Sequence, residues 1–499
     1  MTKPLITSRT DWSKPLIEEV YNHIEDVALN DLKLDVYPNQ IEVISAEQMI
    51  DAYASIGLPV HYNHWSFGKA FMKDWNKYQK GQMGLAYEIV INSNPCISYL
   101  MEENNAITQT LVIAHAAFGH NHFFKNNYLY REWTEASSIV DYMIFAKDYI
   151  RKCEEMYGVD EVEMVLDAAH TISAHGVDKR KRKHKKKMTE EARNAEVMKQ
   201  LDEDQKNLDI IIKKTTFVEE VKAVDPDLED DLADDEENLL YFIYKRAPNM
   251  PQWKREILRI VYKIRQYFYP NGQTKTGNEG FATHTHYYIM NELEKRGIIS
   301  ADAQIAWLHL HSNVIYQSKW TDKWYDGFNP YALGFDVFKE IRRVCEQPTK
   351  EDEEWFPNLV GKDWREAQKD AVANYRDESF LEQFMTPKLI RDYRLFSLRA
   401  EGDVGVVNEI SDEKGYRNIR RQLATQYNMV NYIPEINVHS AKMKKDRTLT
   451  LVYKPFMGRS LHEKYRKEVM QHIKFLWEYP VELVTIGADG SHSIIEQVR

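Results

Sequence analysis

A histidine-rich stretch restricts this fold more than any other part of the sequence. Three histidines follow an apolar run within residues 110–127, namely His115, His120 and His122. A second stretch, residues 277–288, contains Glu279, His284 and His286. Neutral imidazole nitrogens together with a carboxylate are the ligands that a transition metal such as zinc prefers. We therefore predict that the two stretches meet around a divalent metal ion, with zinc as the first choice and iron or manganese as alternatives.

The spacing of the first three histidines leaves two local structures open. In a regular helix His115 and His122 share a face, because seven residues are close to two turns. His115 and His120 are five residues apart and share a face only if the helix contains a π-bulge. Alternatively, the helix stops at Gly119, and both later histidines lie in the turn that follows.

In the second stretch, one carboxylate and one histidine are in phase. Glu279 and His286 share a face of the predicted helix, whereas His284 points elsewhere. The next predicted helix contains a histidine pair. Only its second member, His311, is retained, as a residue that lines the pocket of the predicted metal site. Glu88, at the start of a predicted strand, is the other pocket residue. Each histidine also has a simpler interpretation as a hydrogen-bonded or surface residue.

Hydrolysis at such a metal requires a base within reach of the attacking water. The candidates are Glu132, Glu135 and Glu88, each of which serves only if the fold brings it to the metal. Glu132 and Glu135 share a face at a spacing of three in a helix predicted over residues 132–157. The alternative is that both glutamates merely cap or salt-bridge a surface helix.

Composition excludes several classes of protein. A chain of 499 residues is long enough for two or three domains. The net charge of −11 gives no general attraction to nucleic acid or anionic membranes, and no apolar run approaches the ~20 residues of a spanning helix. The first eleven residues contain no apolar core of the kind that a signal peptide has, so we expect no signal peptide. Three scattered cysteines predict a reducing, cytoplasmic location without disulfides.

A charged segment interrupts the first half of the chain. Residues 176–238 contain a basic block, Lys179–Lys187, and an acidic block over residues 225–237. Such blocks cannot bury an apolar face, so we predict a solvated, mobile insertion. Nucleic acid binding is expected only if the basic block supplies it.

The distribution of predicted elements indicates an α+β fold. Residues 1–347 read as a mainly helical domain that carries the histidines and glutamates, with a turn at residues 329–334. Residues 348–499 begin with a polar bridge and then alternate between strands and helices, which predicts a smaller α+β domain with an antiparallel sheet.

Several motifs together resemble the SpoVR (stage V sporulation protein R, YcgB-like) family, and they span nearly the whole chain: residues 115–127, 278–286, 329–335, 355–357, 377–380 and 415–420. The resemblance implies a link to sporulation and spore cortex formation, or to a stress response in bacteria that do not sporulate. It also implies two partners, a PrkA-type serine kinase and a companion protein with a von Willebrand-like domain.

A second, narrower resemblance is to gluzincin metallopeptidases. Residues 114–120 are similar to their His-Glu-x-x-His helix with one extra residue, and residues 278–282 are similar to the setting of their later glutamate. No glutamate follows His115, so the usual base is missing. Three functions therefore stay open: a metal-dependent hydrolase acting on an amide-containing substrate, a non-catalytic partner of the kinase with a structural histidine cluster, and an oxidative di-metal protein.

Overall fold

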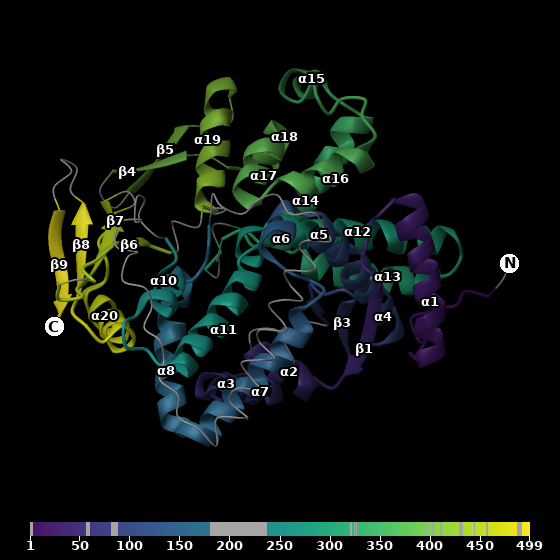
Figure 1. Cartoon of the computed structure of the whole chain (residues 1–499). Coiled ribbons are helices and arrows are strands. Elements are labelled where there is room, and N and C mark those ends of the chain that lie inside the picture. Colours follow the sequence, from purple (N-terminus) through teal and green to yellow (C-terminus); the bar gives the residue numbers. More distant parts are fainter. Residues whose placement is uncertain are drawn as a thin grey trace. The chain divides into compact units, whose positions relative to one another are not determined.

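The structure, a computed structural model (Figure 1), is mostly helical with small sheets, and the predicted α+β class is confirmed. It describes residues 3–55, 60–80, 88–179, 237–319, 322, 323, 325, 327–395, 397–401, 404–409, 412–428, 433–443, 445–455, 458–486 and 492–499. Residues 180–236 of the predicted mobile insertion, with all of its basic block except Lys179, lie outside the described residues. The two ends of the predicted insertion are described, and they contain the buried residues Val177 and Asn238.

Contacts divide the chain into two compact units, and each unit is assembled from three separate stretches. The first unit comprises residues 1–59, 69–137 and 270–428, and the second comprises residues 60–68, 138–269 and 429–499. The division at residue 347 that the sequence suggested stays a prediction.

The first unit carries both histidine-rich stretches on a bundle of helices with a small sheet. Its elements are α1 (Lys14–Asp26), η1 (Val27–Asp31), β1 (Asn39–Ile44), α2 (Ala46–Ala54), α3 (Trp65–Gln79, mostly in this unit), β2 (Glu88–Ile91), β3 (Cys96–Met101), α4 (Ala106–Ile113), η2 (Ala114–His120), α5 (Asn121–Asn126), α6 (Tyr128–Trp133), η4 (Asn271–Gln273), α12 (Lys275–Lys295), α13 (Ala301–Val314), α14 (Pro330–Glu346), α15 (Lys350–Trp355), α16 (Trp364–Asn374), α17 (Asp377–Phe384), α18 (Pro387–Asp392), β4 (Ser397–Glu401), β5 (Val404–Glu409) and α19 (Glu413–Gln426).

The second unit combines five α-helices and one short 3-10 helix, among the described residues, with the C-terminal sheet. Its elements are α7 (Ile139–Tyr157), α8 (Val159–Ile172), η3 (Ser173–His175), α10 (Leu239–Arg246), α11 (Gln252–Phe268), β6 (Glu435–Ala441), β7 (Leu449–Lys454), α20 (Glu463–Trp477), β8 (Val481–Ile486) and β9 (His492–Val498). The sheet has the order β6-β7-β8-β9. The predicted antiparallel sheet is wrong at one pair: β7 and β8 are parallel, because α20 provides the crossover that parallel neighbours require.

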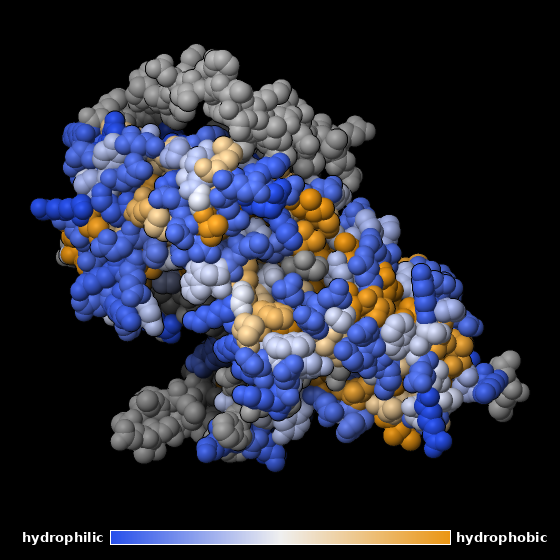
Figure 2. Space-filling model, turned by 90° about the horizontal axis from the view of Figure 1, so that it is seen from below, coloured by the Kyte–Doolittle hydropathy of each residue, from blue (hydrophilic) through white to orange (hydrophobic). Residues whose placement is uncertain are grey.

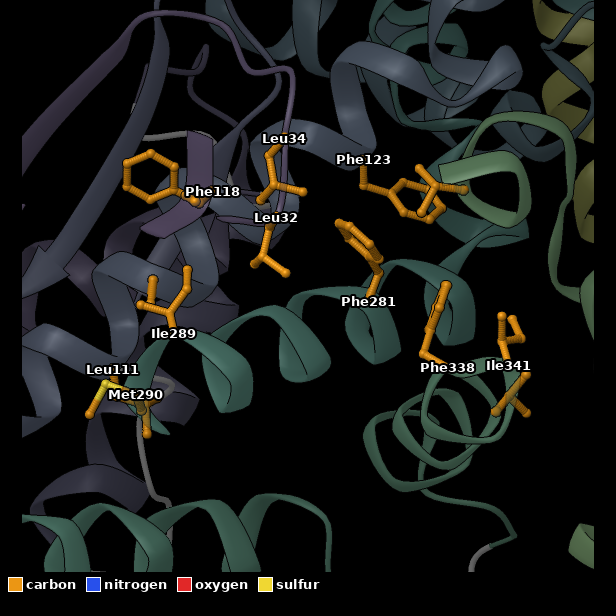
Figure 3. Close-up of a cluster of buried hydrophobic side chains, with 14 of the residues drawn as sticks. Leu32, Leu34, Leu111, Phe118, Phe123, Phe281, Ile289, Met290, Phe338 and Ile341 are labelled. Carbon is orange, nitrogen blue, oxygen red and sulfur yellow. The ribbon is translucent and has the colours of Figure 1, made fainter. Parts of the chain in front are cut away.

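The core of the first unit forms where α12 packs against its neighbours. All eight residues of α4 are buried. In Figure 3, Phe281 of α12 and Phe338 of α14 face each other, and their rings are 5.3 Å apart in a T-shaped arrangement. Phe118 and Ile289 belong to the same buried cluster. The long helix α12, which carries the second histidine-rich stretch, is therefore fixed along much of its length.

A three-stranded sheet places one carboxylate of the candidate site. Its order is β1-β3-β2, with β1 parallel and β2 antiparallel to β3. Glu88 is the first residue of β2 and lies opposite Leu100 in the central strand. Strands β1 and β3 were not predicted, and neither was β9.

Three local predictions need correction. The helix predicted over residues 132–157 is interrupted, because Thr134 is extended and α7 starts only at Ile139. The predicted turn at residues 329–334 is the start of α14: the Asn329 side chain accepts a hydrogen bond from the Tyr331 amide, and a proline occupies the first helical position. The predicted polar bridge contains α15, which Thr349 caps.

Two further sequence predictions concern the surface and the cysteines. Within the described residues, no helix has the length and apolar character needed to cross a membrane. The face drawn in Figure 2 is largely hydrophilic, with apolar residues in separate patches. The three cysteines are buried and free, as the prediction of a chain without disulfides requires.

One buried ion pair makes stability depend on pH. Arg343 donates two hydrogen bonds of 2.8 Å to Asp352, whose side chain is 2 % exposed. Burial alone would raise the pKa of Asp352, but Arg343 and Thr349 hold it at about 2, below the ordinary 3.8. A carboxyl with a lowered pKa stabilises the fold above its unfolded pKa and loses that contribution as the pH falls through the folded pKa.

We expect Asp352→Asn to lower the free energy of unfolding by about 1–3 kcal/mol at pH 7 and by less at pH 3. Urea denaturation at both values measures the difference, with the exposed Asp370→Asn as control. An equal loss at pH 7 and pH 3 would contradict the assigned role of the charge.

Candidate metal centre

A π-helical segment brings the first two histidines together. The segment η2 follows α4 without a break and continues into α5, so the alternative in which the helix stops at Gly119 is wrong. The wider turn places His115 and His120 side by side, with ring centroids 4.6 Å apart. A Cβ atom on Gly119 would lie 2.6 Å from the Cα of Ala282, so only glycine lets η2 approach α12 this closely.

Two carboxylates from other elements face these imidazoles. Glu279 Oε2, from α12, lies 3.5 Å from His115 Nε2 and 3.4 Å from His120 Nε2. Glu88 Oε1, from β2, lies 3.6 Å from His115 Nε2. Ligand atoms of Glu88 and both histidines lie within 4.8 Å of one another. We call these four side chains, Glu88, His115, His120 and Glu279, the metal cluster.

The spacing of the cluster suits a metal ion better than direct hydrogen bonds. Contacts of 3.4–3.6 Å are too long for strong N–H···O hydrogen bonds. Ligand atoms about 2.0–2.1 Å from a tetrahedral zinc ion lie roughly 3.3–3.4 Å from each other. Glu279 Oε2 is buried and has no hydrogen-bond partner within the described part of the chain, which is costly unless an ion satisfies it.

The two carboxylates differ in their affinity for a proton. Burial alone would raise the pKa of Glu279, but His120 and His115 hold it well below its usual range. Burial raises the pKa of Glu88, and the two histidines offset this only in part. Burial lowers the pKa of His120, but Glu279 outweighs it and raises that pKa overall. Glu279 is therefore the firmly ionised carboxylate, and Glu88 is the more basic one.

Access to the cluster comes from the carboxylate side. The side chains of Glu88 and Glu279 are each 18 % exposed, compared with 3 % for His115 and 9 % for His120. The two carboxylates are therefore the more exposed side chains of the cluster.

Hydrogen bonds behind the histidines fix their orientation. His115 Nδ1 lies 2.9 Å from His286 Nδ1, and His286 Nε2 lies 2.9 Å from His311 Nδ1. If His115 Nε2 faces a metal, its Nδ1–H donates to His286, which in turn donates from Nε2 to His311. On the other histidine, His120 Nδ1 donates to Asn278 Oδ1 at 2.9 Å.

The structure therefore gives His286 and His311 a supporting position. Burial lowers the pKa of His286 well below its usual range and that of His311 to about 4, so both rings are neutral at pH 7. His286 was predicted as a ligand, but both its nitrogens are engaged by other histidines, and neither contacts a carboxylate of the cluster.

Two other predicted ligands lie outside the cluster. His122 Nδ1 accepts a hydrogen bond of 3.0 Å from the Asp35 amide, because its position two residues after His120 turns it to another side of the helix. His284 lies 3.3 Å from Gln368 Nε2, on the face of α12 away from Glu279. Burial lowers the pKa to about 4 for His122 and about 3 for His284, so both are uncharged.

Of the three candidate bases, the structure places Glu88 beside His115, whereas Glu132 and Glu135 are not part of the cluster. Glu132 and Glu135 are both exposed. Because α6 ends at Trp133, the two glutamates no longer share a helical face, and the spacing argument that selected them does not apply.

Sequence reasoning overlooked Tyr331. Its ring stacks on His115 with centroids 6.3 Å apart. Burial, Glu279 and Glu88 raise the pKa of Tyr331, so the hydroxyl keeps its proton. The residue lies within a motif that the sequence highlighted, residues 329–335, but the many aromatic residues of the chain were interpreted as core.

Replacement of the supporting histidine should weaken metal binding without removing a ligand. In His286→Leu, His115 loses the partner of its Nδ1, and we expect metal affinity to fall about 10- to 100-fold. Competition with a chromogenic chelator measures the affinity. The control is His122→Gln, which alters a buried histidine outside the cluster and should leave affinity unchanged. Equal affinity in His286→Leu and wild type would contradict the positioning role.

Comparison with known proteins gives a consistent result along the chain. The family model described as SpoVR like protein matches residues 11–432, and the model described as SpoVR-like C-terminal domain matches residues 434–488. The chain is 47 % identical over 489 residues to "Uncharacterized protein YcgB" of Escherichia coli (strain K12), which covers 98 % of this chain and 95 % of that protein. No solved structure matches.

Proposed function

The chain belongs to the SpoVR family, and we propose that its metal cluster binds one divalent ion, with zinc as the first choice. The bound ion serves in the hydrolysis of an amide bond. One observation carries this proposal: the buried, unpartnered Glu279 Oε2 lies 3.4 and 3.5 Å from two imidazole nitrogens. Two imidazoles and a carboxylate form a common ligand set for catalytic zinc, which keeps one position open.

The four side chains divide into ligands and a base. His115, His120 and Glu279 hold the ion, because Glu279 contacts both histidines and stays ionised. Glu88 comes from a different element, and burial raises its pKa, which makes it the more basic carboxylate and suits it to take a proton from water. In this arrangement β2 supplies the base that the sequence around His115 lacks.

When bound, a divalent ion supplies Lewis-acid chemistry, which polarises a carbonyl group and makes water more acidic. Glu88 accepts the proton of the attacking water and returns it to the leaving nitrogen. Tyr331, which remains protonated beside the carboxylates, donates a hydrogen bond to the carbonyl oxygen as negative charge develops there.

The alternatives are less well supported by the geometry. The oxidative di-metal function relied on Glu132 and Glu135 as ligands, and both are exposed outside the cluster. A non-catalytic role beside a PrkA-type kinase and its von Willebrand-like companion stays a prediction.

A substrate screen with defined metal content tests the proposed reaction. Wild-type protein loaded with zinc, iron or manganese is incubated with dipeptides, N-acyl amino acids and cell-wall peptides, and released amines are quantified. We expect turnover of at least one substrate, loss after chelation and recovery with one metal. Metal-loaded protein that hydrolyses none of them would contradict the hydrolase proposal and favour the non-catalytic alternative.

A further inference from the structure

A groove opens between α12 and α14, and none of its lining residues belongs to the metal cluster. The two helices touch at a pair of glycines: a Cβ atom on Gly280 would lie 2.3 Å from the Cα of Gly334. Residues beyond this contact, on both helices, line a cavity of about 410 Å³, so the helices separate as they run from it. This volume is within the range of small-molecule sites, roughly 300–1,000 Å³.

The groove is lined by aromatic rings and an excess of cations. Tyr287, Tyr288 and Phe335 supply apolar surface. Lys295 pairs with Glu292 at 2.5 Å, and Arg342 pairs with Glu346 at 3.0 Å.

A third cation of the lining, Arg343, pairs with Glu340 and Asp352. This leaves Lys339 as the fourth. It is exposed, and no carboxylate lies within salt-bridge distance of it among the described residues. Its ammonium group lies over the Phe335 ring, 6.0 Å from the centroid.

The closed end of the groove is electropositive. His284 lies there, and burial together with Arg342 and Lys339 lowers its pKa to about 3. Arg342 is held in place by stacking on Trp364, with 4.5 Å between the guanidinium carbon and the ring centroid. Its exposed ion pair with Glu346 contributes little energy and is easily exchanged for another anion.

We propose that this groove binds a small anionic ligand, whose carboxylate or phosphate group lies between Lys339 and Arg342 and whose body packs on the tyrosines. An arginine in a fixed orientation and a lysine with no salt-bridge partner in the described part of the chain are the groups that recognise such anions. The site does not depend on the proposed hydrolysis, because Glu279 and the groove residue Tyr288 lie on opposite faces of α12.

Calorimetric titration with two probes, pyrophosphate and citrate, tests the proposal. The experiments use Glu279→Gln protein, because both probes also bind metals and this variant lacks an intact metal cluster. We expect at least one probe to bind once per chain with a dissociation constant in the millimolar range or tighter. Binding of pyrophosphate alone identifies phosphate as the preferred group, and binding of citrate alone identifies carboxylate.

A charge reversal then locates the site. Lys339→Glu, in the same background, should weaken binding by about tenfold or more, and its exposed position leaves the fold unchanged. Lys350→Glu makes the same charge change on the exposed start of α15 and should have no effect. The proposal is wrong if neither probe binds. It is also wrong if Lys339→Glu and Lys350→Glu both bind as tightly as the parent protein, or if both lose affinity to the same extent.

Discussion

Glu88→Gln protein is expected to keep its metal and to lose hydrolytic turnover by about 10²- to 10⁴-fold, the usual contribution of a positioned base. Glutamine preserves the size of the side chain and a carbonyl oxygen, but it cannot accept a proton from water. The effect is confined to the chemical step, because His115, His120 and Glu279 still provide three ligands. Turnover of the best substrate and metal content per chain, both measured on the same preparation, test this expectation.

The matched control for Glu88 is Glu47→Gln, which neutralises an exposed carboxylate on α2 and should leave both quantities unchanged. Two results would contradict the assignment of Glu88 as the base. One is full activity in Glu88→Gln. The other is loss of the metal along with activity, which would make Glu88 a ligand.

Gly334→Ala is expected to destabilise the protein by about 2–4 kcal/mol, because overpacking here meets backbone rather than a flexible side chain. The new methyl carbon would lie 2.1 Å from the Thr276 carbonyl oxygen and 2.7 Å from the Gly280 Cα. Relief of these contacts requires α12 to move, and α12 carries Glu279. Urea denaturation should therefore show a lower midpoint, and metal affinity should fall with it.

A control variant at a second glycine, Gly68→Ala, separates the effect of crowding from the effect of losing a glycine. Gly68 lies within α3, and a Cβ atom there meets nothing within 4 Å. Gly68→Ala should stabilise the protein by up to about 1 kcal/mol, since alanine favours the helix. A Gly334→Ala protein as stable as wild type would show that α12 and α14 are packed less closely than described.

The meeting of the two histidine-rich stretches could be predicted from the sequence. Each stretch places metal-ligating side chains in phase along a helix, and this phase is a local property. Placement of His115 and His120 on one side required a π-helical turn, and the structure has one. The close contact of Gly119 with Ala282 explains why the two stretches approach so closely. The small residue at position 119 was visible in the sequence, but its partner was not.

Other members of the site depend on tertiary structure and could not be assigned by spacing. Glu88 reaches the cluster because β2 pairs with β3, and a strand gives no helical phase to compare. His286 is in phase with Glu279, as predicted, but phase does not distinguish a ligand from a residue that supports one. The choice of Glu132 and Glu135 depended on a continuous helix across Thr134, and that helix is wrong because Thr134 is extended.

Metal content per chain tests the central claim most directly. Plasma mass spectrometry of tag-free wild type should find about one zinc, iron or manganese ion per chain. His115→Ala and Glu279→Ala should each lose that ion, although they alter segments far apart in the sequence, whereas His122→Gln should retain it. Well-folded wild type without metal, or equal metal content in all four proteins, would contradict a metal site built from these side chains.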